Sequence, residues 1–190
     1  MPFYVRVGKV PPKRHTTFYK EDGKSLYREE LFSTKGFSGI YSNKYHLYMP
    51  TEVEKIDEVK IDSSANEWND APLEYYHFIT DKKKSGGNII TARNEFLKNS
   101  HCVISTAHLS EDTEYFYRNS QMHEMLFVHY GKGVLLTEYG KIEFSEWDYL
   151  MIPKGTTYQI KFDDYKNNKL FIVESDTPFD IPKHFRNEYG

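Results

Sequence analysis

The most regular hydrophobic pattern of the chain lies between residues 101 and 174. Apolar and polar positions alternate there in short runs, and this period of two residues is typical of half-buried β-strands. Glycines that suit tight hairpins, Gly131, Gly133 and Gly140, separate several of the runs. Short strands at this close spacing predict a β-sandwich or barrel. The predicted strands are residues 102–108, 124–130, 133–139, 141–144, 149–152, 158–162 and 170–174.

The first hundred residues show a weaker pattern. Residues 1–50 are rich in aromatic residues and turn formers, which predicts an irregular arm with short strands. Alternation over residues 51–60 and an apolar run at residues 73–79 each favour one further strand. Residues 81–88 hold three lysines and two glycines but no large apolar side chain, so we expect a mobile surface loop there.

The length of the chain limits the number of domains. A chain of 190 residues can bury one sizeable core but hardly two independent ones. Aromatic residues make up 16% of it, and such residues suit pleated surfaces better than helices. We therefore expect one all-β domain, in which residues 1–100 form an arm and peripheral strands and residues 101–190 form the core.

Composition and charge exclude several classes of partner. The formal net charge is −3 and the basic residues are scattered, so we expect no nucleic-acid partner. No apolar leader opens the chain and no stretch has the length of a membrane span, which predicts a cytoplasmic protein with no membrane partner. The single cysteine, Cys102, lies in an alternating run and is expected to be a buried, unreactive thiol.

Two stretches of the regular part resemble the sequence motifs of the cupin superfamily. Glu124 and Gly131 fit the glutamate and the glycine of the first motif. Pro153 and Gly155 fit the second motif, and Trp147 stands where that motif begins with a glycine. The resemblance implies a cupin jelly-roll β-sandwich, here with an irregular N-terminal arm.

The metal ligands of the cupin motifs are mostly missing. Counting back from Glu124 places Arg118 and Ser120 where the two histidines of the first motif belong, and Tyr158 replaces the histidine of the second. A catalytic iron needs about three suitable protein ligands, so Glu124 alone is not expected to hold one. We therefore predict no metal-binding, cofactor-binding or catalytic residue in this chain.

The alternation of a β-strand assigns the residues around Glu124 to two faces. His123 shares a face with Phe127 and His129 and is expected to point outward or into an interface, whereas Glu124 points into the barrel. A buried carboxylate needs a partner, and we expect it to pair with Arg118 or to accept a hydrogen bond from Tyr158. Its replacement by alanine would then cost about 1–3 kcal/mol.

Beyond the cupin motifs, the chain resembles the N-terminal half of homogentisate 1,2-dioxygenase, the Fe(II)-dependent enzyme that opens the ring of homogentisate in tyrosine and phenylalanine catabolism. The resemblance extends over most of the chain and implies two cupin halves, with the iron ligands in the C-terminal half. Its most specific segments are residues 9–16, 26–32, 36–39, 112–148 and 182–190.

The family resemblance has consequences for activity and assembly. It implies that this chain lacks the iron-binding half and is inactive by itself, and that its partners are that C-terminal half and further copies, as a trimer or hexamer. The abrupt end at Gly190 favours a fragment over a complete short protein.

Two other functions are compatible with a cupin that has lost its metal ligands. One is a metal-independent isomerase or epimerase, for which Tyr158 and His108 would be the minimum acid–base pair. The other is a non-catalytic binding or assembly module with an aromatic-lined pocket. Turnover without metal would distinguish the first, and ligand binding without turnover the second.

Overall fold

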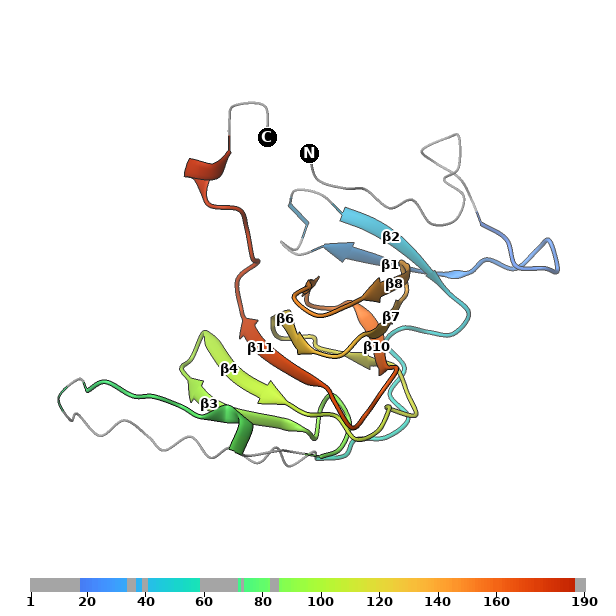
Figure 1. The fold of residues 1–190 in the computed structure, drawn as a ribbon. Coiled ribbons are helices and arrows are strands. Elements are labelled where there is room, and N and C mark those ends of the chain that lie inside the picture. The colour runs from blue at the N-terminus through green and yellow to red at the C-terminus, as the bar shows by residue number, and fades with distance from the viewer. Residues whose placement is uncertain are drawn as a thin grey trace. The chain divides into compact units, whose positions relative to one another are not determined.

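The computed structural model describes residues 18–33, 37–38, 41–58, 72, 74–82 and 86–186, and the chain divides into two compact units, Met1–Glu58 and Val59–Gly190 (Figure 1). The first segment of the homogentisate dioxygenase resemblance, residues 9–16, and residues 187–190 of the last segment, 182–190, lie outside the described residues. No helix in the described part has the length and apolar character of a transmembrane segment.

In the part of the first unit that the structure describes, β1 (Arg28–Ser33) and β2 (Tyr41–His46) form an antiparallel pair. Glu30 on β1 accepts a hydrogen bond from His46 across the pair at 2.7 Å. These are short strands of the kind predicted for the arm. The strands predicted around residues 51–60 and 73–79 are wrong for residues 51–58 and 74–79, which have no strand pairing.

The second unit consists of two antiparallel sheets. The five-stranded sheet has the order β3-β4-β11-β6-β9, and the four-stranded sheet has the order β5-β10-β7-β8. Figure 1 shows β3, β4, β11 and β6 side by side in the first of these sheets. The bounds are β3 (Arg93–Lys98), β4 (Cys102–Ala107), β5 (Tyr117–Arg118), β6 (His123–Tyr130), β7 (Gly133–Thr137), β8 (Gly140–Phe144), β9 (Tyr149–Ile152), β10 (Thr157–Phe162) and β11 (Lys169–Ser175). Two 3₁₀ turns, η1 (Thr80–Lys82) and η2 (Lys183–Phe185), complete the elements.

The pairing of strands β4 to β11 is that of a jelly roll. The first of these eight strands pairs with the last, β4 with β11, and the second pairs with the second last, β5 with β10. The series continues inward with β6 and β9 and ends at the β7–β8 hairpin. This nested order is a long hairpin rolled into two sheets, so the predicted all-β jelly-roll sandwich is confirmed.

The core lies between the two sheets, and every second residue of the central strands points into it. Leu126, Val128 and Leu170 from one sheet and Tyr158 and Ile160 from the other are almost fully buried. All seven strands predicted between residues 102 and 174 are present, with ends shifted by one or two residues. Each of these strands is buried mainly on one face, so its apolar and polar residues alternate. This alternation is the signal from which the sequence predicts them.

Two strands of the second unit were not predicted. β3 reads Arg-Asn-Glu-Phe-Leu-Lys and lies at the edge of its sheet, where polar residues obscure the alternation. It pairs with β4 although the sequence prediction left it outside the core. β5 has two residues, too few for a periodic signal. Cys102 is half-buried rather than buried.

The structure explains the glycine with which the second cupin motif begins. Trp147 occupies that position and has a φ of 74°, a left-handed conformation that glycine adopts without strain and tryptophan does not. The hairpin glycines Gly131 and Gly140 also have positive φ, as predicted. Gly133 is not among the residues with positive φ. The backbone of Lys161 lies so close to it that no room is left for a side chain, which explains why a glycine stands there.

Candidate functional site

The retained motif residue Glu124 lies inside the jelly roll. It is the second residue of β6 and is 1% exposed. Leu126 and Val128, two and four residues later, are also buried, whereas Met125 and Phe127 are half-buried. The predicted face of Glu124 is therefore confirmed, and its partners decide what the site can do.

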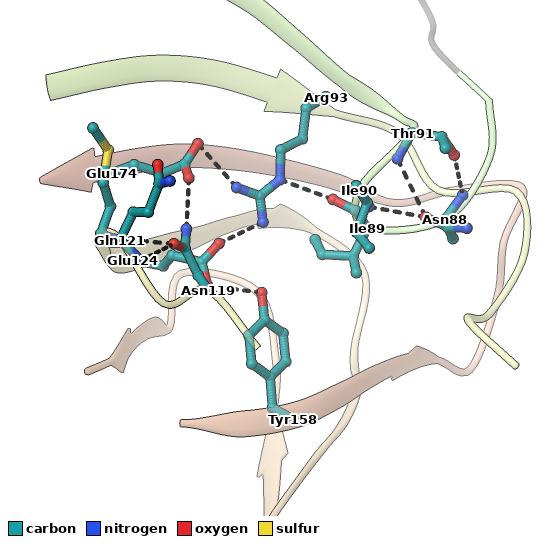
Figure 2. A network of polar contacts seen from close by, with 11 residues as sticks. Asn88, Ile89, Ile90, Thr91, Arg93, Asn119, Gln121, Glu124, Tyr158 and Glu174 are labelled. Carbon is teal, nitrogen blue, oxygen red and sulfur yellow. Dashed lines mark hydrogen bonds and ion pairs between the residues drawn. The ribbon is translucent and has the colours of Figure 1, made fainter. Parts of the chain in front are cut away.

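The partner of Glu124 is a cation that the sequence did not indicate. Arg93 Nη2 lies 2.5 Å from Glu124 Oε1, and Arg93 Nη1 lies 2.9 Å from Glu174 Oε2 (Figure 2). Arg93 Nε donates a third hydrogen bond to the carbonyl oxygen of Ile89 at 2.9 Å. The Arg93 side chain is only 3% exposed, so the guanidinium is buried between two carboxylates.

A tight turn before β3 positions the guanidinium. The Asn88 side-chain oxygen accepts hydrogen bonds from the backbone N–H groups of Ile90 and Thr91, at 2.9 and 3.2 Å. The N–H of Ala92 donates to the Asn88 carbonyl at 2.9 Å. Figure 2 shows this turn beside the head of Arg93. Part of the predicted mobile loop, residues 81–88, lies outside the described residues. Its last residue, Asn88, is held in place by these hydrogen bonds.

Two further side chains bind the outer oxygens of the carboxylates. The Tyr158 hydroxyl donates to Glu124 Oε2 at 3.1 Å, which confirms the predicted hydrogen bond. The Asn119 amide donates to Glu174 Oε1 at 2.8 Å. The ring of Tyr117 meets Tyr158 edge to face at 5.4 Å between ring centroids. All four carboxylate oxygens thus have a donor.

The electrostatics of the network depend on Arg93. Glu124 and Glu174 are directly opposite each other on β6 and β11, where two like charges repel. Burial is the largest single effect and would lower the pKa of the Arg93 guanidinium, but Glu124 together with Tyr158, Glu174 and Tyr117 outweighs it and raises the pKa well above its usual value. Burial, and then the Glu124 charge, raise the pKa of Tyr158, so its hydroxyl stays protonated and donates.

The predicted ligand positions need a correction of one residue. Arg118 and Ser120 are exposed, and Tyr117 and Asn119 contact the network instead. The connection from β5 to β6 is therefore one residue longer than the cupin motif spacing that was counted back from Glu124. A shift of one residue exchanges the two faces of a strand, so Tyr117 and Asn119 take the inward positions. The expectation that Arg118 pairs with Glu124 is replaced by the Arg93 pair.

The interior does not fit an iron ion. Glu124 already shares its oxygens between a guanidinium and a phenol, and Tyr158 and Asn119 are poor ligands for Fe(II) compared with imidazole. The described residues contain no group of three or more histidine, cysteine, aspartate or glutamate side chains that could hold a metal.

A cavity of about 360 Å³ opens beside the network. Arg93, Tyr117, Asn119, Gln121 and Glu174 contribute to its wall. The cavity lies at the edge of the otherwise buried ion pairs. Its lining is mixed in charge and contains no histidine.

His123 and His129 lie on the face of β6 opposite to Glu124. His123 is 2% exposed, and the backbone N–H of Lys154 donates to its Nδ1 at 3.2 Å, so the expected outward position is wrong for this residue. Burial, and then the Lys154 charge, lower the pKa of His123, so it is neutral. The ring of His129 packs edge-on against Phe127, as expected for an outer-face residue.

The acid–base pair that an isomerase would need is not assembled. Tyr158 is buried and hydrogen-bonded to Glu124. His108 lines a different cavity, together with Asp81 and Tyr130. The register of β4 with β11 places His108 on the outer side of the sheet, because Ala107 faces the core with Leu170.

Sequence reasoning missed two members of the network, Arg93 and Glu174. Arg93 lies in an edge strand with little alternation. Glu174 was within a predicted strand, and counting from buried Leu170 and Ile172 would have placed it on the inner face. A charged residue on an inner face is the signal that could have indicated it.

Comparison with known proteins gives a curated relative. No family model matches the chain. Over 191 residues the chain is 42% identical to a Saccharolobus solfataricus protein named "Putative dioxygenase SSO1533"; the match covers all of this chain and 48% of the relative. The chain therefore spans about half the length of the curated relative it matches.

Solved structures of cupins are more distant. A cupin protein from Bacteroides fragilis has 21% identity and a TM-score of 0.39, with 50% of this chain and 86% of that one covered. A cupin-2 domain containing protein from Shewanella frigidimarina has 13% identity and a TM-score of 0.39, with 44% and 78% covered. The jelly-roll assignment rests on the strand pairing of the chain itself.

Proposed function

We propose that this chain is the structural, non-catalytic cupin half of a homogentisate 1,2-dioxygenase-like protein, in which Fe(II) and ring cleavage belong to a second cupin. The observation that carries the proposal is the Arg93 guanidinium between Glu124 and Glu174. The barrel retains one carboxylate of the cupin motif, and a buried cation binds it. The interior therefore serves the stability of the fold and not the binding of a metal. Two facts from one comparison support the proposal: the relative is named "Putative dioxygenase SSO1533", and this chain spans about half of it.

The first prediction concerns iron. After anaerobic incubation with Fe(II) and desalting, the chain should retain far less than one iron per molecule, because Glu124 is already bound and the imidazole ligands are absent. Metal analysis by mass spectrometry measures this, and an assay of homogentisate loss with added Fe(II) should show no turnover. About one iron per chain, lost in Glu124→Gln, would contradict the proposal.

We also propose a surface for the predicted self-association. On and beside β9, Trp147, Tyr149 and Met151 are 68%, 61% and 54% exposed, and they adjoin half-buried Phe127 on β6. β9 is an edge strand of its sheet among the described strands. Exposed aromatic residues beside an open edge are typical of a contact site.

The sequences of the edge strands favour β9 over the other edges. Proteins protect open edges with charged side chains, and β3, β5 and β8 all carry them. β9 reads Tyr-Leu-Met-Ile and carries none. A second copy of the chain fits this edge, because two β9 strands can pair antiparallel about a twofold axis and place their aromatic residues side by side.

The second prediction tests this surface. Tyr149→Glu should weaken self-association at micromolar concentration, since it places a charge on the only described uncharged edge strand of the second unit. Sedimentation velocity measures the change. Ile142→Glu on β8, an apolar residue that is 48% exposed on an edge that already carries charges, is the matched control and should have little effect. A monomeric unmodified chain, or equal effects of both substitutions, would contradict the surface.

A further inference from the structure

We infer that the interior of the jelly roll is a built site for a planar guanidinium-type cation, and that the chain fills this site with its own Arg93. The inference rests on the geometry of the network and holds whether or not the chain belongs to a dioxygenase. Arg93 then takes the place of a bound cation, and β3 attaches it covalently to the protein.

The acceptors of this site are fixed by contacts other than Arg93. Tyr158 holds the far oxygen of Glu124, and Asn119 holds the far oxygen of Glu174. The register between β6 and β11 keeps the two glutamates opposite each other. The third acceptor, the Ile89 carbonyl, belongs to a turn that the Asn88 side chain caps. Since these contacts do not involve the guanidinium, we expect them to hold the acceptors in place against the repulsion of the two carboxylates when it is removed.

The arrangement selects a planar cation with several N–H donors. Three nitrogens of one guanidinium each meet a different acceptor, at 2.5 to 2.9 Å. The guanidinium carbon also lies 5.7 Å from the centre of the Tyr117 ring, within the range of cation–π attraction. An ammonium group is a point charge without this planar fork and does not match the acceptors equally well.

The structure also provides an entrance to the site. Arg93 and Glu174 lie in the wall of the 360 Å³ cavity that opens at this end of the barrel. Shortening Arg93 to alanine would join the vacated volume to that cavity. A free guanidinium ion could then reach the two carboxylates from solution.

The experiment is chemical rescue of Arg93→Ala. Millimolar guanidinium chloride, far below denaturing concentration, should raise the melting midpoint of this variant in a saturable way, because a ligand that binds the folded state stabilises it. Urea has the same shape without charge, and sodium chloride supplies the same ionic strength, so neither should reproduce the rise. Equal midpoints in guanidinium chloride and sodium chloride would overturn the inference.

A second buried cation provides the matched control. Lys169 is 4% exposed, and its Nζ donates to Thr80 and pairs with Asp81. Lys169→Ala also removes a buried positive charge but leaves no pair of opposed carboxylates. Guanidinium should therefore not raise its midpoint, and a rescue equal to that of Arg93→Ala would contradict a specific site.

A second measurement applies if Arg93→Ala does not fold. Arg93→Met is made in the unmodified chain and in a Glu124→Gln/Glu174→Gln background. If Arg93 serves as the cation of the two carboxylates, the drop in midpoint should be much smaller in the neutral background. A drop of the same size in both backgrounds, or a failure to fold in both, would overturn the inference.

Discussion

Replacing Glu124 with alanine is expected to lower the free energy of unfolding by about 3–5 kcal/mol, because the substitution leaves the buried Arg93 charge with one carboxylate fewer. This is more than the 1–3 kcal/mol expected from the sequence for a hydrogen-bonded carboxylate. The difference comes from the partner, which is a cation with 3% of its side chain exposed rather than the exposed Arg118.

Glu124→Gln separates the loss of charge from the loss of the acceptor. It keeps an oxygen that can accept from Arg93 or Tyr158, so it should cost less than alanine. Urea denaturation measures both variants, and urea is preferred because guanidinium is itself the inferred ligand of this region. Glu114→Ala, at an exposed position, should stay within about 0.5 kcal/mol of the unmodified chain. A similarly small effect of Glu124→Ala would refute a structural role for this carboxylate.

Replacing Gly133 with alanine should destabilise the fold by about 3 kcal/mol or more. A Cβ atom built on Gly133 would lie 2.0 Å from the carbonyl oxygen of Lys161 and 2.9 Å from the Cα atom of Phe162. Both are backbone atoms of β10, to which β7 is paired, so the two strands would have to separate. The expected result is a large loss of stability measured by urea denaturation.

Gly86→Ala is the matched control for Gly133→Ala. A Cβ atom there would meet only the Ser110 side chain, at 3.4 Å, which is an ordinary contact. Its substitution should have a small effect. Equal costs at the two positions would show that the close approach of β10 is not the cause of the loss at Gly133.

The sequence by itself determined the strands of the core and the direction of Glu124. Both follow from alternation, which is local, since each residue of a strand faces opposite to its neighbour. This rule found β4 and β6 to β11 and placed Glu124 with Leu126 and Val128 inside the barrel. The absence of the cupin imidazoles was also readable from residue types alone, and it predicted an interior unsuited to iron.

Only the tertiary structure decided what replaces the metal site. Arg93 and Glu124 are 31 residues apart, and no local pattern relates them. They meet because β3 joins the sheet beside β4 and because β11 pairs with both β4 and β6, which brings Glu174 opposite Glu124. A strand of two residues, β5, has no period from which its inward side can be read, so the sequence placed Arg118 and Ser120 at the positions that Tyr117 and Asn119 occupy. Pairing between distant strands sets these positions, because hydrogen-bond register is a property of two strands together and of neither alone.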